Sequence, residues 1–258
     1  MTRTKYYLGL FCILLSGVAS GQGMFGAGHC LLAHHPATLL WENGHVVYGQ
    51  YQPHFLTKEI SDMEWAGSHT FQGNGLLWSI RHIGFTGFGT MECRLGYGRR
   101  FGKQVGVVLQ GCYLWRHARH YPGVHSFTIH LSMAYQMSQK LLLAVTLYNP
   151  IRMKYGIVGQ EVIPMSFNVM LRYAAGRTVL LDLNIEKRLP IGFEIGSMAH
   201  YTPKRAVSFH LTCSNMRCGV GISVGWRTLR LLVQGDWYYR TGITPSIELL
   251  YQSQAKPS

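Results

Sequence analysis

Ten charged residues occupy the polar positions of segments in which apolar and polar residues alternate. There, their side chains can pair with one another or line a polar path. They are Glu92, Arg94, Arg172, Asp182, Glu186, Glu194, Arg227, Arg230, Asp236 and Glu248. Because residues two apart in a strand share a face, all ten are expected to point the same way. They can line a permeation path or a ligand site, or they can pair across neighbouring strands. The pairing interpretation is favoured, because an unpaired buried charge is costly.

Histidine and serine offer other chemistry, but neither has the spacing that such chemistry needs. His29, His34 and His35 cluster near the N-terminus without the spacing of a zinc helix or finger. No Gly-x-Ser-x-Gly motif is present, and no serine and acid share the expected face of His125. We therefore expect no metal, no cofactor and no enzyme activity.

Two cysteines flank a tight connection. Cys213 and Cys218 stand on either side of Ser214-Asn215-Met216-Arg217. Five cysteines remain once the predicted signal peptide is removed, and an odd number argues against a full disulfide framework. The pair can bridge a hairpin, or both can be ordinary apolar strand residues. Both interpretations stay open.

Long alternating segments must position these residues. Residues 125–137 alternate apolar with small or polar side chains, and 105–115 and 217–227 repeat the pattern. Strands of soluble sandwiches are shorter, typically about five or six residues, whereas strands of about 9–11 residues with aromatic ends are typical of membrane barrels. The other face is rich in Ser, Thr, Gly and Gln, as expected of a lumen. The sequence predicts an all-β fold, a transmembrane antiparallel β-barrel of about 14 strands.

The predicted strands are 44–52, 63–72, 75–84, 89–100, 104–115, 125–137, 140–149, 165–175, 178–187, 191–200, 205–213, 217–227, 229–239 and 243–251. An even count places both termini on the periplasmic side. The connections 53–62, 116–124 and 150–164 are then long outer loops. Met153, Tyr155 and Ile163 make the last one apolar, so we expect it to fold inward over the lumen or dock a partner, with a simple extended hairpin as the alternative.

Composition and charge agree with this class. Only 14% of the 258 residues are charged and 30 are Gly, which excludes a disordered chain and a coiled coil. The net charge of +13 is spread out, without zinc spacing or a phosphate-binding loop. We expect anionic lipid head groups as partners, and not nucleic acid.

The N-terminal residues are typical of a secretory signal. Arg3 and Lys5 precede the apolar segment 6–15 and small residues at 16–20. The apolar segment is short for a span of about 20 residues. We expect a signal peptide at 1–20 read by the Sec pathway, an N-terminal hatch at 21–43, an outer-membrane barrel at 44–251 and a tail at 252–258.

Basic residues gather in the predicted outer loops and strand tops. The candidates are Arg116, Arg119, Arg152, Lys154, Lys187 and Arg188. Such groups suit phosphate, so this outer rim either contacts lipopolysaccharide or is simply solvated.

With the strands laid out, residues 24–251 resemble the outer-membrane barrels of Bacteroidota related to PorV and PorQ, within the FadL-like fatty-acid transporter group. Asn43 and Gly44 match the turn that ends the hatch of that family, although the Pro-Ala between them is absent. Tyr148-Asn149-Pro150 matches a strand end of the family. The resemblance implies fourteen strands and a hatch, whose candidates are Leu39, Leu40, Trp41, Asn43 and Gly44. It also implies transport of a small hydrophobic molecule, or alternatively an adaptor role in type IX secretion or another envelope complex.

Overall fold

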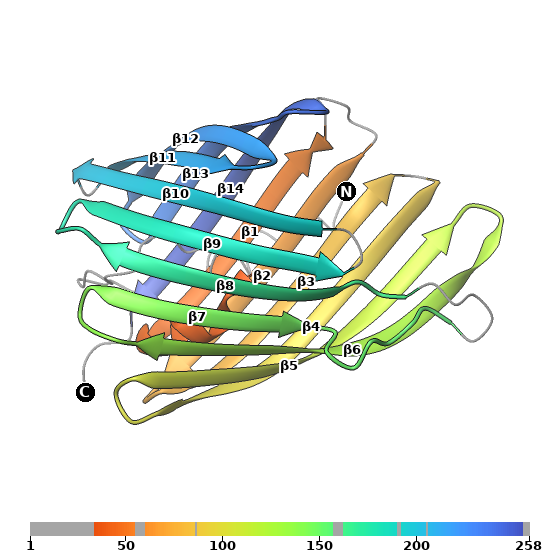
Figure 1. Ribbon diagram of the computed structural model, residues 1–258, viewed down its shortest axis with the longest axis horizontal. Coiled ribbons are helices and arrows are strands. Elements are labelled where there is room, and N and C mark those ends of the chain that lie inside the picture. Colours follow the sequence, from red (N-terminus) through yellow and green to blue (C-terminus); the bar gives the residue numbers. More distant parts are fainter. Residues whose placement is uncertain are drawn as a thin grey trace, which may run out of the picture.

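The structure, a computed structural model, describes residues 34–54, 60–85, 87–156, 162–189, 192–204 and 206–254. The predicted signal peptide and the first part of the predicted hatch lie outside these residues. The described residues form 14 antiparallel strands in a closed barrel, in which each strand pairs with its neighbours along the chain and β1 pairs with β14 (Figure 1). The predicted fold class is therefore confirmed.

The strands are β1 (Gly44–Pro53), β2 (Ser61–Phe71), β3 (Asn74–Phe85), β4 (Phe88–Phe101), β5 (Val105–Ala118), β6 (Tyr121–Gln136), β7 (Leu141–Tyr148), β8 (Met165–Ala174), β9 (Val179–Leu189), β10 (Gly192–Lys204), β11 (Val207–Ser214), β12 (Arg217–Trp226), β13 (Leu229–Tyr238) and β14 (Gly242–Gln254). We call the end of the barrel where β1 begins and β14 ends the terminal end, and the opposite end the loop end.

The alternation of the sequence becomes an apolar outside and a largely polar inside. Along β5, Leu109 is 53% exposed, whereas its neighbours Val108 and Gln110 are buried. Along β12, Val220, Ile222 and Val224 are exposed, whereas Ser223 is buried. This is the reverse of a water-soluble domain, and an apolar surface of this extent is stable against lipid.

Large aromatic side chains lie on the outside at both ends of the barrel. Phe71, Phe101 and Tyr173 are exposed next to turns of the terminal end. Phe193 and Trp237 are exposed next to turns of the loop end. Aromatic girdles of this kind flank the apolar band of membrane barrels.

Several predicted strand boundaries differ from the structure by a few residues, and two of them change the expected connections. The connection 116–124 is not a long loop, because β5 and β6 continue to Ala118 and Tyr121 with a register shift. Polar and aromatic residues interrupt the alternation in this segment, so the sequence pattern did not show that both strands continue. At the C-terminus, β14 runs to Gln254, paired with Gly44, so the barrel extends beyond the predicted residue 251.

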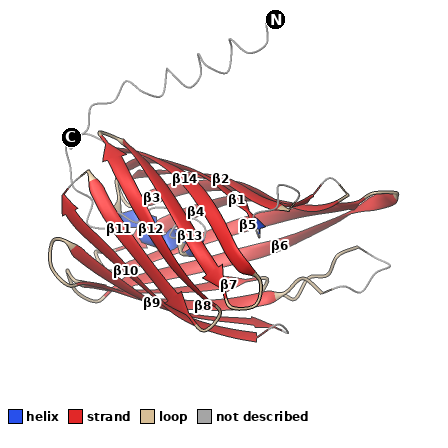
Figure 2. Ribbon diagram, turned by 90° about the horizontal axis from the view of Figure 1, so that it is seen from above, coloured by secondary structure: helices blue, strands red, loops and turns tan. Residues whose placement is uncertain are grey.

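A short helix precedes the barrel. The 3₁₀-helix η1 (Pro36–Trp41) has Pro at its start, where the missing N–H costs nothing. In the part of the chain that the structure describes, no helix is long and apolar enough to span a membrane. The helix η1 instead lies inside the ring of strands, toward the terminal end (Figure 2).

Candidate functional site

The hatch helix fills a pocket in the barrel wall. Residues 36–40 are buried, and Leu40 is fully so. A Cβ atom at Gly75 would lie 2.8 Å from Leu40 Cδ2, and Cβ atoms at Gly98 and Gly106 would each lie 3.1 Å from Leu40 methyl carbons. The absence of side chains at these three glycines therefore creates the space that Leu40 occupies.

Polar contacts fix the hatch around this apolar anchor. The backbone N–H of Ala37 donates to Ser132 Oγ (3.4 Å), Trp41 Nε1 donates to the Lys103 carbonyl (3.1 Å), Gln252 Nε2 donates to Glu42 Oε2 (2.7 Å), and Thr70 Oγ1 donates to the Glu42 carbonyl. Of the predicted hatch residues, Leu39 and Leu40 are buried in the helix and Trp41 is anchored. Asn43 is exposed, and Gly44 is the first residue of β1, with a φ of 126°.

His35 and Glu42 are titratable groups of the hatch whose pKa values burial shifts in opposite senses for docking. The His35 side chain is 1% exposed, and its Nδ1 lies 3.0 Å from Thr146 Oγ1. Burial lowers the pKa of His35 from 6.5 to about 4, so the contribution of His35 to docking is full above pH 6.5 and weakens as the pH falls toward 4. Burial raises the pKa of Glu42 from 4.5 to about 7, so the contribution of Glu42 strengthens as the pH falls from 7 to 4.5.

We expect His35→Asn, which keeps a polar side chain without a titration, to change how hatch docking responds to acid. Between pH 7 and pH 4 the wild type should lose docking strength relative to the variant, because only the wild type gains a proton at residue 35 on undocking. Single-channel conductance in planar bilayers should therefore rise more, or fall less, on acidification in the wild type than in the variant. An identical pH response in both proteins would show that His35 is not responsible.

Five neighbouring strands contribute to a chain of polar contacts on the lumen face. Arg172 donates to both oxygens of Asp182, at 2.7 and 2.6 Å, and both side chains are buried. His200 Nε2 lies 3.6 Å from Asp182 Oδ2. His200 and His210 meet through their Nδ1 atoms at 2.6 Å, and His210 Nε2 lies 3.0 Å from Ser223 Oγ. The contacts link β8, β9, β10, β11 and β12.

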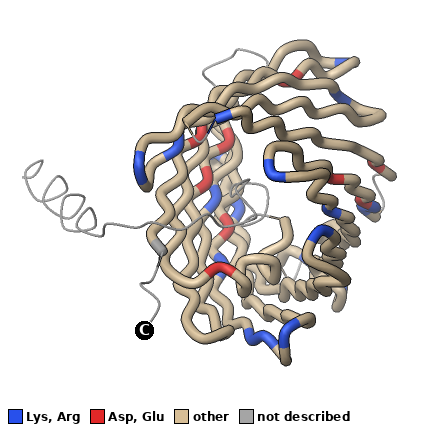
Figure 3. The backbone as a smooth tube through the Cα atoms, turned by 90° about the vertical axis from the view of Figure 1, so that its left-hand side faces the viewer, with Lys and Arg blue, Asp and Glu red and all other residues tan. Residues whose placement is uncertain are grey.

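Acids and bases also meet elsewhere on the lumen face. These ion pairs are Arg81 with Asp62 (2.5 Å), Arg94 with Glu92 (2.9 Å), Arg188 with Glu186 (2.5 Å) and Arg217 with Asp236 (3.0 Å). Figure 3 marks the acidic and basic positions along the wall. Pairing of this kind matches the interpretation favoured from the sequence.

Most predicted lumen residues share this inner face. Glu92, Arg172, Asp182, Glu186, Asp236 and Glu248 are buried, whereas Arg94, Glu194 and Arg230 are half-buried at the same parity. The prediction for Arg227 was wrong. It is exposed in the turn after β12 with a φ of 56°, and its guanidinium lies 5.6 Å from the Trp226 ring centroid. The strand ends one residue earlier than predicted, so parity no longer determines where Arg227 points.

Three lumen charges were missed from the sequence. Asp62, Glu64 and Arg81 all face inward, and the two carboxylates are buried. The signal was present, because exposed Trp65 and Ile80 define the outer parity of β2 and β3. Neighbouring residues of a strand point to opposite faces, so Glu64 and Arg81, next to Trp65 and Ile80, are expected to point inward.

The Arg172–Asp182 pair provides a stability test. Arg172→Met leaves a buried carboxylate without its main partner, and we expect it to destabilise the barrel by about 3–5 kcal/mol. The double variant Arg172→Met with Asp182→Leu removes both charges and should recover most of that loss. Urea unfolding in lipid vesicles measures both. A double variant as unstable as the single one would contradict the buried-pair interpretation.

An apolar cluster lies at the loop end of the barrel, between the wall and the β7–β8 connection. Tyr155 and Ile163, from the connection between β7 and β8, are buried against Leu114, Val124 and Tyr148 of the wall. Arg116 stacks its guanidinium 4.0 Å from the Tyr155 ring centroid. The described part of this connection therefore folds inward, as expected from its composition, and residues 157–161 lie outside the described residues.

Asn149 is the anchor of this connection. It is fully buried with a φ of 51°. Its Nδ2 donates to the carbonyl of Ile163 (2.7 Å), and its Oδ1 accepts from Met153 N (2.8 Å) and Thr128 Oγ1 (2.7 Å). Asn tolerates the left-handed backbone better than most residues, so this side chain suits both the turn and the contacts.

Asn149→Ala should release the connection. We expect faster trypsin cleavage at Arg152 or Lys154 in intact cells, because the loop loses three hydrogen bonds and a favourable turn residue. Ser126→Ala is the matched control, since it removes one bond, from Ser126 Oγ to the Lys154 carbonyl. Equal protection of Asn149→Ala and the wild type would show that Asn149 does not hold the loop.

The predicted basic rim divides into two groups. Arg119, Arg152, Lys154 and Lys187 are exposed at the loop end. Arg116 instead faces inward beneath Tyr155, and Arg188 pairs with Glu186. Alternation explains both, because Arg116 and Arg188 share the parity of the lumen residues.

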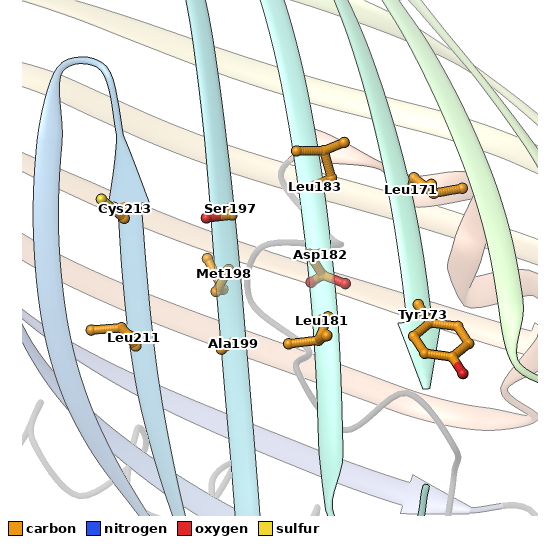
Figure 4. A pocket seen from close by; sticks show the side chains of 10 residues that line it. All are labelled: Leu171, Tyr173, Leu181, Asp182, Leu183, Ser197, Met198, Ala199, Leu211 and Cys213. Atoms are coloured by element: carbon orange, nitrogen blue, oxygen red, sulfur yellow. The ribbon is translucent and has the colours of Figure 1, made fainter. Parts of the chain in front are cut away.

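A depression of about 290 Å³ lies on the outer wall between β8 and β11. Ser197 and Ala199 are small, and larger neighbours such as Leu181, Leu183 and Leu211 stand on both sides (Figure 4). Its lining is mainly of outward parity, so it faces the surroundings of the barrel. Across the described ranges, no group of three or more His, Cys, Asp or Glu residues is arranged to hold a metal.

Solved structures share this architecture. The chain is similar to the CymD monoaromatic hydrocarbon channel, with a TM-score of 0.63, 10% identity, and 91% of this chain and 96% of that chain covered. It is similar to the Pseudomonas putida toluene transporter TodX, with a TM-score of 0.64, 7% identity and coverages of 91% and 98%. It is also similar to the Acinetobacter baumannii outer membrane protein Omp33, with a TM-score of 0.50, 9% identity and coverages of 82% and 98%.

No family model matches the sequence, and no curated protein matches it significantly. At such low identities the structural likeness concerns the fold. The chain therefore has the fold of outer-membrane channel barrels, with a short helix lodged inside it.

Proposed function

We propose that the chain is an outer-membrane β-barrel that carries a small hydrophobic molecule across that membrane. The observation that carries the proposal is an apolar outer face with aromatic residues at both ends, around an interior that holds a buried helix. Similarity to two barrels whose names describe hydrocarbon or toluene transport supports the substrate class. Membership of the PorV/PorQ group, a Bacteroidota source and Sec export form the finer part of the proposal.

In this orientation the terminal end faces the periplasm, since both termini of bacterial barrels lie there. The loop end faces outward, and Arg119, Arg152, Lys154 and Lys187 lie where lipopolysaccharide phosphates would meet them. Phosphate contacts at these four positions are part of the proposal, because Arg and Lys donors suit phosphate oxygens.

Clusters of apolar side chains lie at both ends of the lumen. Leu114, Tyr155 and Ile163 form an apolar cluster at the loop end, and the hatch with Leu77, Val108 and Leu142 forms another at the terminal end. Paired charges, including Arg172 with Asp182, lie on the wall of the lumen. A hydrophobic molecule would enter beneath the loop and leave only after the hatch moves.

Uptake into proteoliposomes tests this function. Purified protein in vesicles with lipopolysaccharide in the outer leaflet should accelerate the entry of labelled toluene relative to empty vesicles. A folded barrel that leaves the entry rate unchanged would contradict transport of this substrate class.

A second candidate is an adaptor that does not transport, within type IX secretion or another envelope complex. The observation that favours it is the close packing of inward side chains, since Thr128, Ser132 and Arg172 have no more than 1% of their surface exposed. Cross-linking followed by affinity purification from the outer membrane should then recover a secretion component in fixed proportion. Toluene uptake without such a component favours the transporter.

A further inference from the structure

Two thiols face each other at the loop end of the β11–β12 hairpin. Cys213 and Cys218 are direct partners in the antiparallel register, and their sulfur atoms lie 2.9 Å apart. Cys213 is exposed and Cys218 half-buried, and both are free thiols in this structure. Cys213 also borders the depression on the outer wall (Figure 4).

We propose that Cys213 and Cys218 are a redox modification site that closes to a cross-strand disulfide. Directly opposed residues of an antiparallel pair have Cα atoms about 4.5–5.5 Å apart, and disulfides need about 4.4–6.8 Å. The backbone register therefore already satisfies the geometry. The inference goes beyond the proposed transport function and does not depend on it.

The other described cysteines do not form such a pair. Cys93 lies opposite Tyr113, and Cys112 lies opposite Arg94. Cys93 and Cys112 belong to adjacent strands but have opposite parity, so one points out of the barrel and the other is buried within it. They are an internal control for a nonspecific oxidation.

Tyr239 distinguishes the two thiols. Its hydroxyl lies 3.1 Å from Cys218 Sγ and 3.3 Å from the Ser214 carbonyl, so its single proton can turn to either acceptor. A hydroxyl that turns to the sulfur stabilises a Cys218 thiolate, whereas the sulfur of Cys213 contacts that of Cys218 itself. Cys218 is therefore the attacking residue and Cys213 the resolving one.

The oxidant is a small-molecule or protein disulfide, the chemical class found in oxidising compartments. The Cys218 thiolate attacks one sulfur of that disulfide, forms a mixed disulfide and expels a thiolate. The Cys213 thiolate then attacks Cys218 Sγ and expels the second thiolate. Two protein thiols lose two electrons and two protons, and the oxidant is reduced to two thiols.

The bond would secure a turn that already contacts its neighbour. Asn215 in this turn donates from Nδ2 to the Phe193 carbonyl (3.1 Å) and accepts from Ile195 N (3.1 Å). Next to the turn, Arg217 pairs with Asp236. A disulfide at 213–218 would hold this outer edge of β10–β13 together.

Peptide mapping tests the site. The purified full chain is equilibrated in buffers of reduced and oxidised glutathione, quenched with acid, alkylated and digested with trypsin. Trypsin cuts at Arg217, between the two cysteines, so the disulfide joins peptide 206–217 to peptide 218–227. We expect this joined species, two hydrogens lighter than the sum of the two peptides, while Cys93 and Cys112 remain alkylated.

Two variants sharpen the test. Cys218→Ser should abolish the joined species and leave Cys213 free for alkylation. Tyr239→Phe should slow the alkylation of Cys218 by iodoacetamide severalfold without changing that of Cys93. Full alkylation of both thiols across the redox series, or linkage of either to Cys93 or Cys112, would overturn the proposal.

Discussion

Leu109→Arg is expected to impair insertion of the barrel into the membrane. Leu109 lies on the outer face of β5, opposite Leu131, and is 53% exposed. A cationic side chain on the lipid face near the bilayer midplane costs about 2–4 kcal/mol. Urea-dependent folding into lipid vesicles, followed by the gel shift of the folded barrel, measures the loss.

Tyr121→Arg provides the depth control. Tyr121 is 75% exposed but lies at the tip of β6, beyond the apolar band. Tyr121→Arg should reduce the free energy of folding into the membrane by no more than about 1 kcal/mol, because the penalty for Arg falls toward the interface. Equal stability of the two variants would contradict a membrane-embedded outer face.

Leu40→Asp is expected to release the hatch and raise single-channel conductance. Leu40 is fully buried next to Gly75, Gly98 and Gly106 and belongs to an apolar cluster with Leu77 and Val108. A carboxylate there has no hydrogen-bond partner, so docking becomes unfavourable by several kcal/mol. The conductance of the variant in planar bilayers should exceed that of the wild type.

Asn43→Asp is the matched control for charge. It adds the same carboxylate at an exposed position just after the helix, so conductance should stay at the wild-type value. A Leu40→Asp barrel that folds normally and conducts no more than the wild type would show that the hatch does not close the lumen.

The strands were predictable because successive side chains along each strand face lipid and lumen in turn, so apolar and polar residues alternate. All 14 strands overlap their predicted ranges, since outward residues such as Leu109 and Val220 must be apolar. The strand ends were harder to predict. Ala118 and Arg227 lie where the membrane no longer constrains the pattern, and local turn geometry decides there.

The interior contacts followed less directly from the sequence. Parity placed Arg172 and Asp182 on one face, but their partnership depends on the register of the β8–β9 hairpin, which the geometry of its turn fixes. The pocket of Leu40 combines glycines of the consecutive strands β3, β4 and β5, all of them far from Leu40 in the sequence. Such a pocket carries no local signal, because each glycine alone is compatible with an ordinary strand.

The most direct test of the account locks the hatch to the wall. Ala37 N and Ser132 Oγ lie 3.4 Å apart, so Ala37→Cys with Ser132→Cys places a thiol on each side. We predict that oxidation of this pair stops toluene uptake into proteoliposomes and that reduction restores it, whereas the wild type is unaffected by either treatment. Uptake that persists through the locked hatch would contradict transport through this lumen.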